Sequence, residues 1–185
     1  MTQRLFVAVV PPPPVRDAWD AFLEPRREVG TELRWMLSES WHVTCAFMGR
    51  VPDADVDDLD EGLAAVAART RPFTLTVEGG GAFPNPDAAK VLWLGVTEGA
   101  QELGALAVRC RTAASVRGIE VDGGRFRPHV TVARLKGQRV LRWLPVLDAI
   151  GPQTWPVTEF RLVRSHLLPG GSGYQTVGEY ALTRP

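Results

Sequence analysis

Short apolar runs alternate along the chain with longer segments in which apolar residues recur at every third or fourth position. The runs are typical of strands, and the longer segments are typical of amphipathic helices. Glycine and proline separate many of them, because neither residue continues a helix or a strand ladder well. The pattern predicts strands over 4–10, 33–37, 41–48, 73–77, 91–96, 127–135, 157–165 and 174–182, and helices over 15–30, 53–69, 103–116 and 139–150.

Two segments rich in glycine and proline are expected to connect strands. One is 79–86, and the other is the turn from Pro169 to Gly173. Strands and helices follow one another without strict β-α-β alternation, which favours an α+β fold with an antiparallel sheet over a doubly wound parallel sheet. No segment has the composition of a linker, so we expect residues 1–185 to form a single domain.

Composition narrows the class of protein. The chain has 185 residues, of which 45% are apolar and 23% charged, and this balance is typical of a globular domain rather than a disordered chain. No apolar run approaches the roughly 20 residues of a membrane-spanning helix, and Pro11–Pro14 follow the first strand without the pattern of a secretory signal. The two cysteines, Cys45 and Cys110, are too few for a disulfide framework. We therefore expect a cytoplasmic protein whose cysteines are small buried side chains.

The net charge is zero, but the charged residues are unevenly distributed along the chain. The 21 basic and 21 acidic side chains cancel, and a neutral domain is a poor candidate for coating nucleic acid. Residues 53–61 are strongly acidic and fit the solvated first turns of a helix, whereas 109–142 are rich in arginine. Arginine suits phosphate recognition, so the arginines near the motif described next are candidate binding residues.

One tripeptide occurs twice. His42-Val43-Thr44 and His129-Val130-Thr131 are 87 residues apart (129 − 42), and each lies on a predicted strand. Side chains alternate between the two faces of a strand, so the histidine and threonine of each copy share a face while the valine points into the core. A half-buried structural histidine would be the ordinary interpretation of one copy. Two copies in matched settings instead predict that four polar groups converge on one cleft.

Two imidazoles and two hydroxyls suit chemistry at phosphorus. An imidazole titrates near neutrality, so one can accept a proton while the other donates one. Hydroxyl groups can donate hydrogen bonds to the non-bridging oxygens of a phosphoryl group. No acidic metal cluster accompanies the motifs, so we expect neither a metal nor a cofactor. The natural substrate for such a pair is a cyclic phosphodiester that water opens.

These residues resemble those of a known family. The doubled motif resembles that of the 2H phosphoesterase superfamily, and segments 34–35, 41–49 and 126–134 are similar to those of the RNA 2′,3′-cyclic phosphodiesterases, historically called 2′-5′ RNA ligases. The resemblance implies a bilobal, pseudo-twofold fold in which two antiparallel sheets form a central cleft with helices on the outside. It also implies metal-independent hydrolysis of an RNA 2′,3′-cyclic phosphate end to a 2′-phosphomonoester, with weak reverse 2′-5′ ligation.

The resemblance also implies roles for single residues. His42 would donate a proton to the leaving 3′ oxygen, and His129 would accept one from water. Thr44 and Thr131 would hold the phosphate oxygens. The partner would be an RNA or nucleotide with a cyclic phosphate end, and we expect a monomer with no obligate protein partner and no membrane contact.

Five further residues are weighed from their positions. Arg127 precedes the second histidine by two and is a candidate contact to the RNA backbone, whereas Arg134 reaches the phosphate only if its strand ends or bends. Trp35 and Phe47 are candidates for stacking on a base, with core packing as the alternative. His166 lacks a threonine partner and is expected to be structural or to lie at the edge of the cleft.

Two other functions stay open from the sequence. The substrate could be a small nucleotide-derived cyclic phosphate such as ADP-ribose 1″,2″-cyclic phosphate instead of an RNA end. The cleft could also be a nucleotide-binding module without catalysis.

Overall fold

The fold is described from a computed structural model, which covers residues 1–168 and 171–183. It has four α-helices and nine strands in these residues, joined by short connections and single turns of 3₁₀ helix. In chain order the elements are β1 (Thr2–Val9), α1 (Pro13–Arg27), β2 (Arg34–Trp35), β3 (Val43–Pro52), α2 (Val56–Ala68), β4 (Phe73–Phe83), β5 (Ala89–Glu98), α3 (Ala100–Ser115), β6 (His129–Gln138), α4 (Leu144–Asp148), β7 (Gln153–Val157), β8 (Glu159–Leu168) and β9 (Gly171–Ala181).

The strands form one antiparallel sheet with two halves. Within the described residues the strand order is β7-β4-β5-β6-β3-β1-β8-β9, and the short β2 pairs with β6 farther along the edge that also pairs with β3. The halves β7-β4-β5-β6 and β3-β1-β8-β9 meet where Val43 pairs with Val130. The prediction of an α+β fold with antiparallel pairing is therefore confirmed, and the two sheets expected from the resemblance are continuous at this point.

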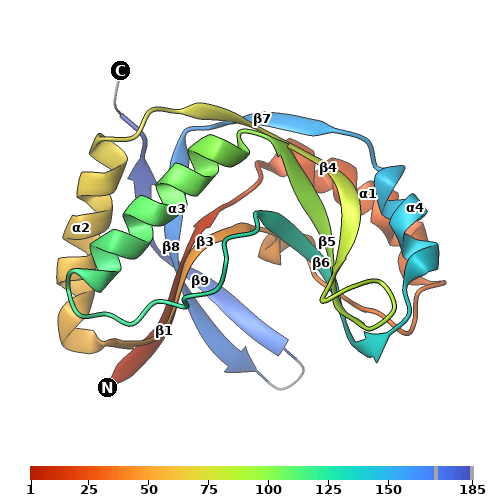
Figure 1. Ribbon diagram of the computed structural model, residues 1–185, viewed down its shortest axis with the longest axis horizontal. Coiled ribbons are helices and arrows are strands. Elements are labelled where there is room, and N and C mark those ends of the chain that lie inside the picture. Colours follow the sequence, from red (N-terminus) through yellow and green to blue (C-terminus); the bar gives the residue numbers. More distant parts are fainter. Residues whose placement is uncertain (169–170, 184–185) are drawn as a thin grey trace.

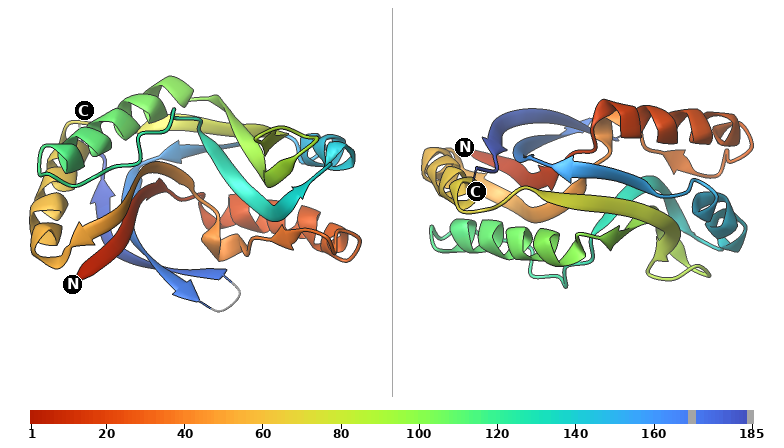
Figure 2. Two further views of the ribbon diagram at one scale, coloured as in Figure 1. Left: turned by 60° about the horizontal axis from the view of Figure 1, so that its bottom comes forward. Right: turned by 90° about the horizontal axis from the view of Figure 1, so that it is seen from above.

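The helices lie on the outer side of a curled sheet (Figures 1 and 2). Helices α2 and α3 pack on the half that contains β3 and β9, and α1 and α4 pack on the half that contains β4 and β7. Each pair therefore covers the outside of one half and leaves the inner face open. No helix in residues 1–168 and 171–183 is both long and apolar enough to cross a membrane.

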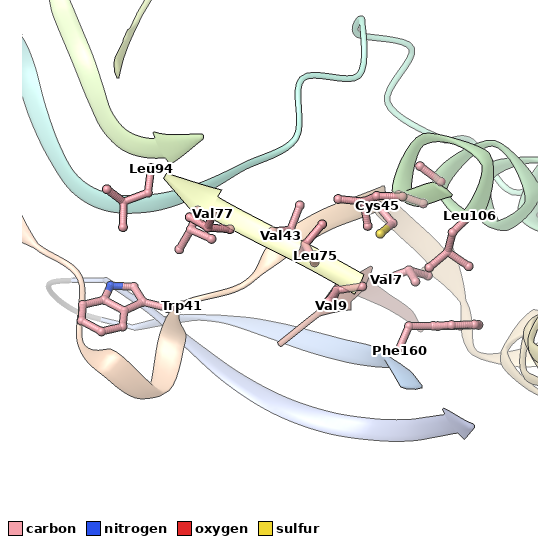
Figure 3. Close-up of a cluster of buried hydrophobic side chains, with 14 of the residues drawn as sticks. Val7, Val9, Trp41, Val43, Cys45, Leu75, Val77, Leu94, Leu106 and Phe160 are labelled. Atoms are coloured by element: carbon pink, nitrogen blue, oxygen red, sulfur yellow. The ribbon is translucent and has the colours of Figure 1, made fainter. Parts of the chain in front are cut away.

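One hydrophobic cluster lies between the sheet and the helices. Figure 3 shows side chains from β1, β3, β4, β5, α3 and β8 gathered in it. From α1, Trp19 enters the cluster edge-on to Trp41 and Trp155, with ring centroids 5.9 and 6.1 Å apart. Cys45 and Cys110 are free thiols buried in the cluster, as expected, and burial raises the pKa of Cys45 to about 12.

Three sequence expectations need correction. The segment 79–86 is not all loop, because β4 continues through Gly79–Gly81 to Phe83. Strand β3 does not end at Gly49 but runs to Pro52. Strand β7 was not expected as a separate element, although it pairs with β4 at the edge of the sheet. The expected turn from Pro169 to Gly173 lies partly outside the described residues.

Candidate active site

The two copies of the tripeptide lie side by side at the centre of the sheet. Strands β3 and β6 run antiparallel with Val43 opposite Val130, so His42 faces Thr131 and His129 faces Thr44. Both valines are fully buried, whereas the histidines and threonines are half-buried on the other face. The structure thus brings the four polar groups together on the inner face of the sheet, in an arrangement with twofold symmetry.

A β-bulge follows each copy of the tripeptide. On β3, Ala8 pairs with Thr44 and Val7 with Ala46, which leaves one extra residue on β3. On β6 the same two-against-one count occurs between Thr131 and Ala133. A bulge of this kind shifts the alternation of side chains by one position.

The bulges decide where Phe47 and Arg134 point. Without them both residues would share the face of the buried valines; with them both lie on the face of the imidazoles, at equivalent places five residues after each histidine. Arg134 is exposed and close enough to lower the pKa of both histidines through its charge. Arg134 was expected to reach the phosphate only if its strand ended or bent, and the bulge after Thr131 supplies this irregularity.

Aromatic rings surround each imidazole. His42 lies 4.7 Å from the ring of Phe6 and 5.4 Å edge-on from Tyr174. His129 lies 4.9 Å edge-on from Phe83 and 6.2 Å from Trp93. These contacts fix the plane of each ring and remove water from its faces.

The indole of Trp93 lies across Gly81 of the neighbouring strand. A Cβ atom at Gly81 would stand 2.1 Å from the indole, closer than any real contact, so this position must be glycine for the ring to lie there. The glycine run that resembles a loop in the sequence is a platform for an aromatic ring beside the site.

The two histidines are held in the same way. Nδ1 of His42 lies 2.7 Å from the carbonyl oxygen of Ser40, and Nδ1 of His129 lies 2.6 Å from that of Arg127. A carbonyl oxygen can only accept a hydrogen bond, so Nδ1 carries the proton in both neutral rings. The free lone pair of each neutral ring is therefore on Nε2.

Burial keeps both rings neutral in the free protein. It lowers the pKa of His42 to about 4, with smaller contributions in the same direction from His129 and Arg134, while the bond to the Ser40 carbonyl opposes the shift. The pKa of His129 is lowered by burial and by Arg134. A negative charge bound between the rings acts against these effects, because it favours the imidazolium form.

The two threonine hydroxyls are free to bind a ligand. Neither Thr44 nor Thr131 makes a side-chain hydrogen bond to another described residue. Each stands beside the histidine of its own strand and opposite the histidine of the other. The two threonines and the two histidines thus alternate around one position on the inner face, an arrangement that suits a tetrahedral phosphoryl group.

A cavity of about 410 Å³ opens beside His129 and Thr44. Aromatic and cationic side chains line it. Arg111 anchors one wall by donating to the carbonyl oxygens of Cys45 and Gly124, at 3.4 and 3.1 Å. Besides Thr44 and His129, the residues that line it are Cys45, Phe47, Phe83, Pro84, Arg111, Asp122, Arg125, Phe126 and Arg127. Phe47 and Arg127, both expected near the substrate, therefore belong to this cavity.

Trp35 lies on the other face of the sheet, and the expectation that it stacks on a base is corrected. Its ring packs edge-on against Trp143, 5.4 Å away, and its indole nitrogen donates to the carbonyl oxygen of Gly30. It pairs with Ala133, which is fully buried. His166 is exposed and lies on β8, where its Nε2 is 3.5 Å from Oε1 of Gln175.

Sequence reasoning missed the residues that pack around the imidazoles. Phe6, Phe83, Trp93 and Tyr174 come from four different strands, so no local motif connects them. Strand alternation could have placed Phe6 opposite the buried Leu5 and Val7. The partners of the others depend on strand pairings that the sequence alone does not reveal.

A twofold pair of histidines and threonines at the junction of two antiparallel half-sheets defines a 2H phosphoesterase. Comparison with known proteins agrees. The family model described as the 2′-5′ RNA ligase superfamily matches residues 11–167, and the chain belongs to this family. It is a phosphodiesterase by that membership and by its relatives.

The relatives cover nearly the whole chain. The chain is 32% identical to the RNA 2′,3′-cyclic phosphodiesterase of Archaeoglobus fulgidus, over 93% of this chain and 96% of the relative. It is 30% identical to that of Escherichia coli, over 98% of each. Escherichia coli LigT complexed with 3′-AMP superposes with a TM-score of 0.75 at 28% identity, covering 100% of both chains.

Proposed function

We propose that this protein hydrolyses RNA 2′,3′-cyclic phosphate ends to 2′-phosphomonoesters without a metal. The observation that supports the proposal is the twofold register of the motifs, in which each histidine lies opposite the threonine of the other strand and each Nδ1 is bonded to a backbone carbonyl. In-line displacement needs a base on one side of phosphorus and an acid on the other. The relatives in Archaeoglobus fulgidus and Escherichia coli are RNA 2′,3′-cyclic phosphodiesterases, which supports the same substrate here.

The reaction is a single displacement with two proton transfers. Nε2 of His129 accepts a proton from water as its oxygen attacks phosphorus. The bond from phosphorus to the 3′ oxygen breaks, and that oxygen takes a proton from Nε2 of His42. The products are a 2′-phosphomonoester and a 3′ hydroxyl, and the two imidazoles have exchanged protonation states. A 5′ hydroxyl can replace water in the same steps: its oxygen attacks phosphorus, the bond to the 3′ oxygen breaks, and a 2′-5′ linkage forms, so weak 2′-5′ ligation is expected.

The remaining polar groups stabilise the charge on phosphorus. The hydroxyls of Thr44 and Thr131 donate to its non-bridging oxygens, and the guanidinium of Arg134 supplies a positive charge nearby. Phe47 and Arg127, in the adjoining cavity, contact the terminal nucleoside. The negative charge of the bound substrate also favours protonation of His42, because it raises the pKa that burial lowers.

The decisive experiment compares three histidine variants. His42→Ala and His129→Ala should each lower kcat on an oligonucleotide 2′,3′-cyclic phosphate at least a hundredfold, since each removes one proton transfer. His166→Ala is the matched control and should keep full activity. Circular dichroism checks that all three fold. Undiminished turnover by either of the first two variants would contradict the mechanism.

A second measurement separates the alternative functions. ADP-ribose 1″,2″-cyclic phosphate is offered to the unmodified protein in parallel with the oligonucleotide, and kcat/KM is compared. A higher value for the ADP-ribose compound would make the small molecule the substrate. Tight binding of a 2′-phosphorylated nucleotide with no hydrolysis of either compound would instead identify a binding module.

A further inference from the structure

A second arginine stands beside Arg134. Strand β2 pairs with β6 on the same edge as β3, and in this pairing Arg34 is directly opposite Arg134. Directly opposite residues project to the same face, with Cβ atoms about 5 Å apart. The next pair, Trp35 with Ala133, points into the core, so both arginines lie on the face of the imidazoles.

This arginine pair has no counter-ion from the protein. Both side chains are exposed, and within residues 1–168 and 171–183 no carboxylate lies at ion-pair distance from either guanidinium. Other arginines do have a counter-ion from the protein: Arg139 pairs with Asp87, and Arg142 pairs with Glu32. Like charges directly opposite on adjacent strands are destabilising, and a bound anion would offset that cost.

The charge of Arg134 lowers the pKa of both His42 and His129, whereas Arg34 is not among the causes for either ring. The guanidinium of Arg34 is therefore the farther of the two from the imidazoles, although both arginines lie on the same face of the sheet. The anion that Arg34 contacts is therefore a second phosphoryl group of the same ligand, next to the one that reacts.

We propose that Arg34 binds the 5′ phosphate of the terminal nucleotide, the next anion along an RNA chain that ends in a cyclic phosphate. This inference rests on the proposed function and names its substrate class: an oligonucleotide end, or a nucleotide that carries a 5′ phosphate, in preference to a nucleoside with a free 5′ hydroxyl. A bidentate guanidinium–phosphate contact supplies the preference.

The test uses two substrates that differ in one group. A nucleoside 2′,3′-cyclic phosphate with a 5′ hydroxyl is compared with the same compound bearing a 5′ phosphate. In Arg34→Ala, kcat/KM for the 5′-phosphorylated compound should fall at least about tenfold, mainly through KM, while the 5′-hydroxyl compound changes less than about twofold. Arg69→Ala, an exposed arginine at the end of α2, is the control and should change neither.

Two results would overturn the assignment. An equal loss on both substrates would mean that Arg34 contacts the reacting phosphoryl group or supports Arg134. No loss on either would mean that it binds nothing in this ligand.

A binding measurement tests Arg34 independently of turnover. Nucleoside 2′-monophosphate and 2′,5′-bisphosphate are titrated into both proteins, and the tighter binding of the bisphosphate should disappear in Arg34→Ala. If the unmodified protein hydrolyses neither cyclic compound, the proposed function fails, and this titration still decides the role of Arg34. A bisphosphate advantage that survives the substitution would refute it.

Discussion

At the scale of single residues, burial and substrate charge act in opposite directions on the two imidazoles. Burial makes the neutral ring the resting form, and the carbonyls of Ser40 and Arg127 fix which nitrogen is bare. Neutral rings with bare Nε2 atoms are two bases and no acid. The mechanism proposed above needs one imidazolium, so on that mechanism the site becomes competent only when a proton binds with, or before, an anionic substrate.

The pH dependence should show this. A pKa lowered in the free protein means that the singly protonated pair becomes abundant only as pH falls below the usual range of histidine. We expect kcat/KM to rise from pH 8 toward acid and then to fall once both rings are protonated. In the complex the bound anion raises both pKa values, so the alkaline limb of kcat should lie at higher pH than that of kcat/KM. Rate profiles between pH 4 and 9 check this, and a kcat/KM maximum above pH 8 would contradict it.

At the scale of elements, the sequence predicted the features that follow from local periodicity. It missed the features that depend on how the strands pair. The strands with the two motifs, the amphipathic helices and the face shared by each His and Thr follow from periodicity and spacing. The bulges after Thr44 and Thr131 do not, because an extra residue is visible only against the partner strand. Arg134 and Phe47 were therefore uncertain as site residues. Trp35 was misplaced because an aromatic next to a motif does not reveal its face.

One contact between elements offers a clean stability test. The hydroxyl of Tyr180 on β9 donates to Asp60 on α2 at 2.6 Å and ties the acidic helix to the edge strand. Tyr180→Phe removes this bond and keeps the ring stacked on Phe160. Because the exposed Asp60 carboxylate regains water, we expect a loss of about 1 kcal/mol in the free energy of unfolding, measured by urea denaturation. Activity should be unchanged, and equal stability would show that water replaces the bond at no cost.

At the scale of the whole molecule, the two half-sheets are held together mainly by a shared hydrophobic core and less by the narrow junction between their strands. Their strands meet at one residue pair, but the hydrophobic cluster runs beneath both halves. Charge is separated across the fold as well. Acidic residues of α2 are exposed on the outer side, and Arg34, Arg127 and Arg134 are on the inner side. The zero net charge therefore coexists with a cationic inner face.

Unfolding should be a single cooperative transition because of this core. Far-ultraviolet circular dichroism and tryptophan fluorescence should give the same midpoint in denaturant. Val130→Ala, at the junction, should lower the free energy of unfolding by about 1–3 kcal/mol and shift both signals together. Separate midpoints for the two probes would mean that the halves unfold independently.

The two bulges also affect the orientation in which a phosphodiester can bind. A site with strict twofold symmetry would accept a phosphodiester in either of two orientations at equal energy, so neither histidine would be distinguished as acid or base. The equivalent positions after the bulges hold a benzene ring at Phe47 and a guanidinium at Arg134. These unlike side chains make the two orientations unequal in energy. The duplicated motifs supply matched polar groups, and this pair of residues is one of the differences between the two ends of the site.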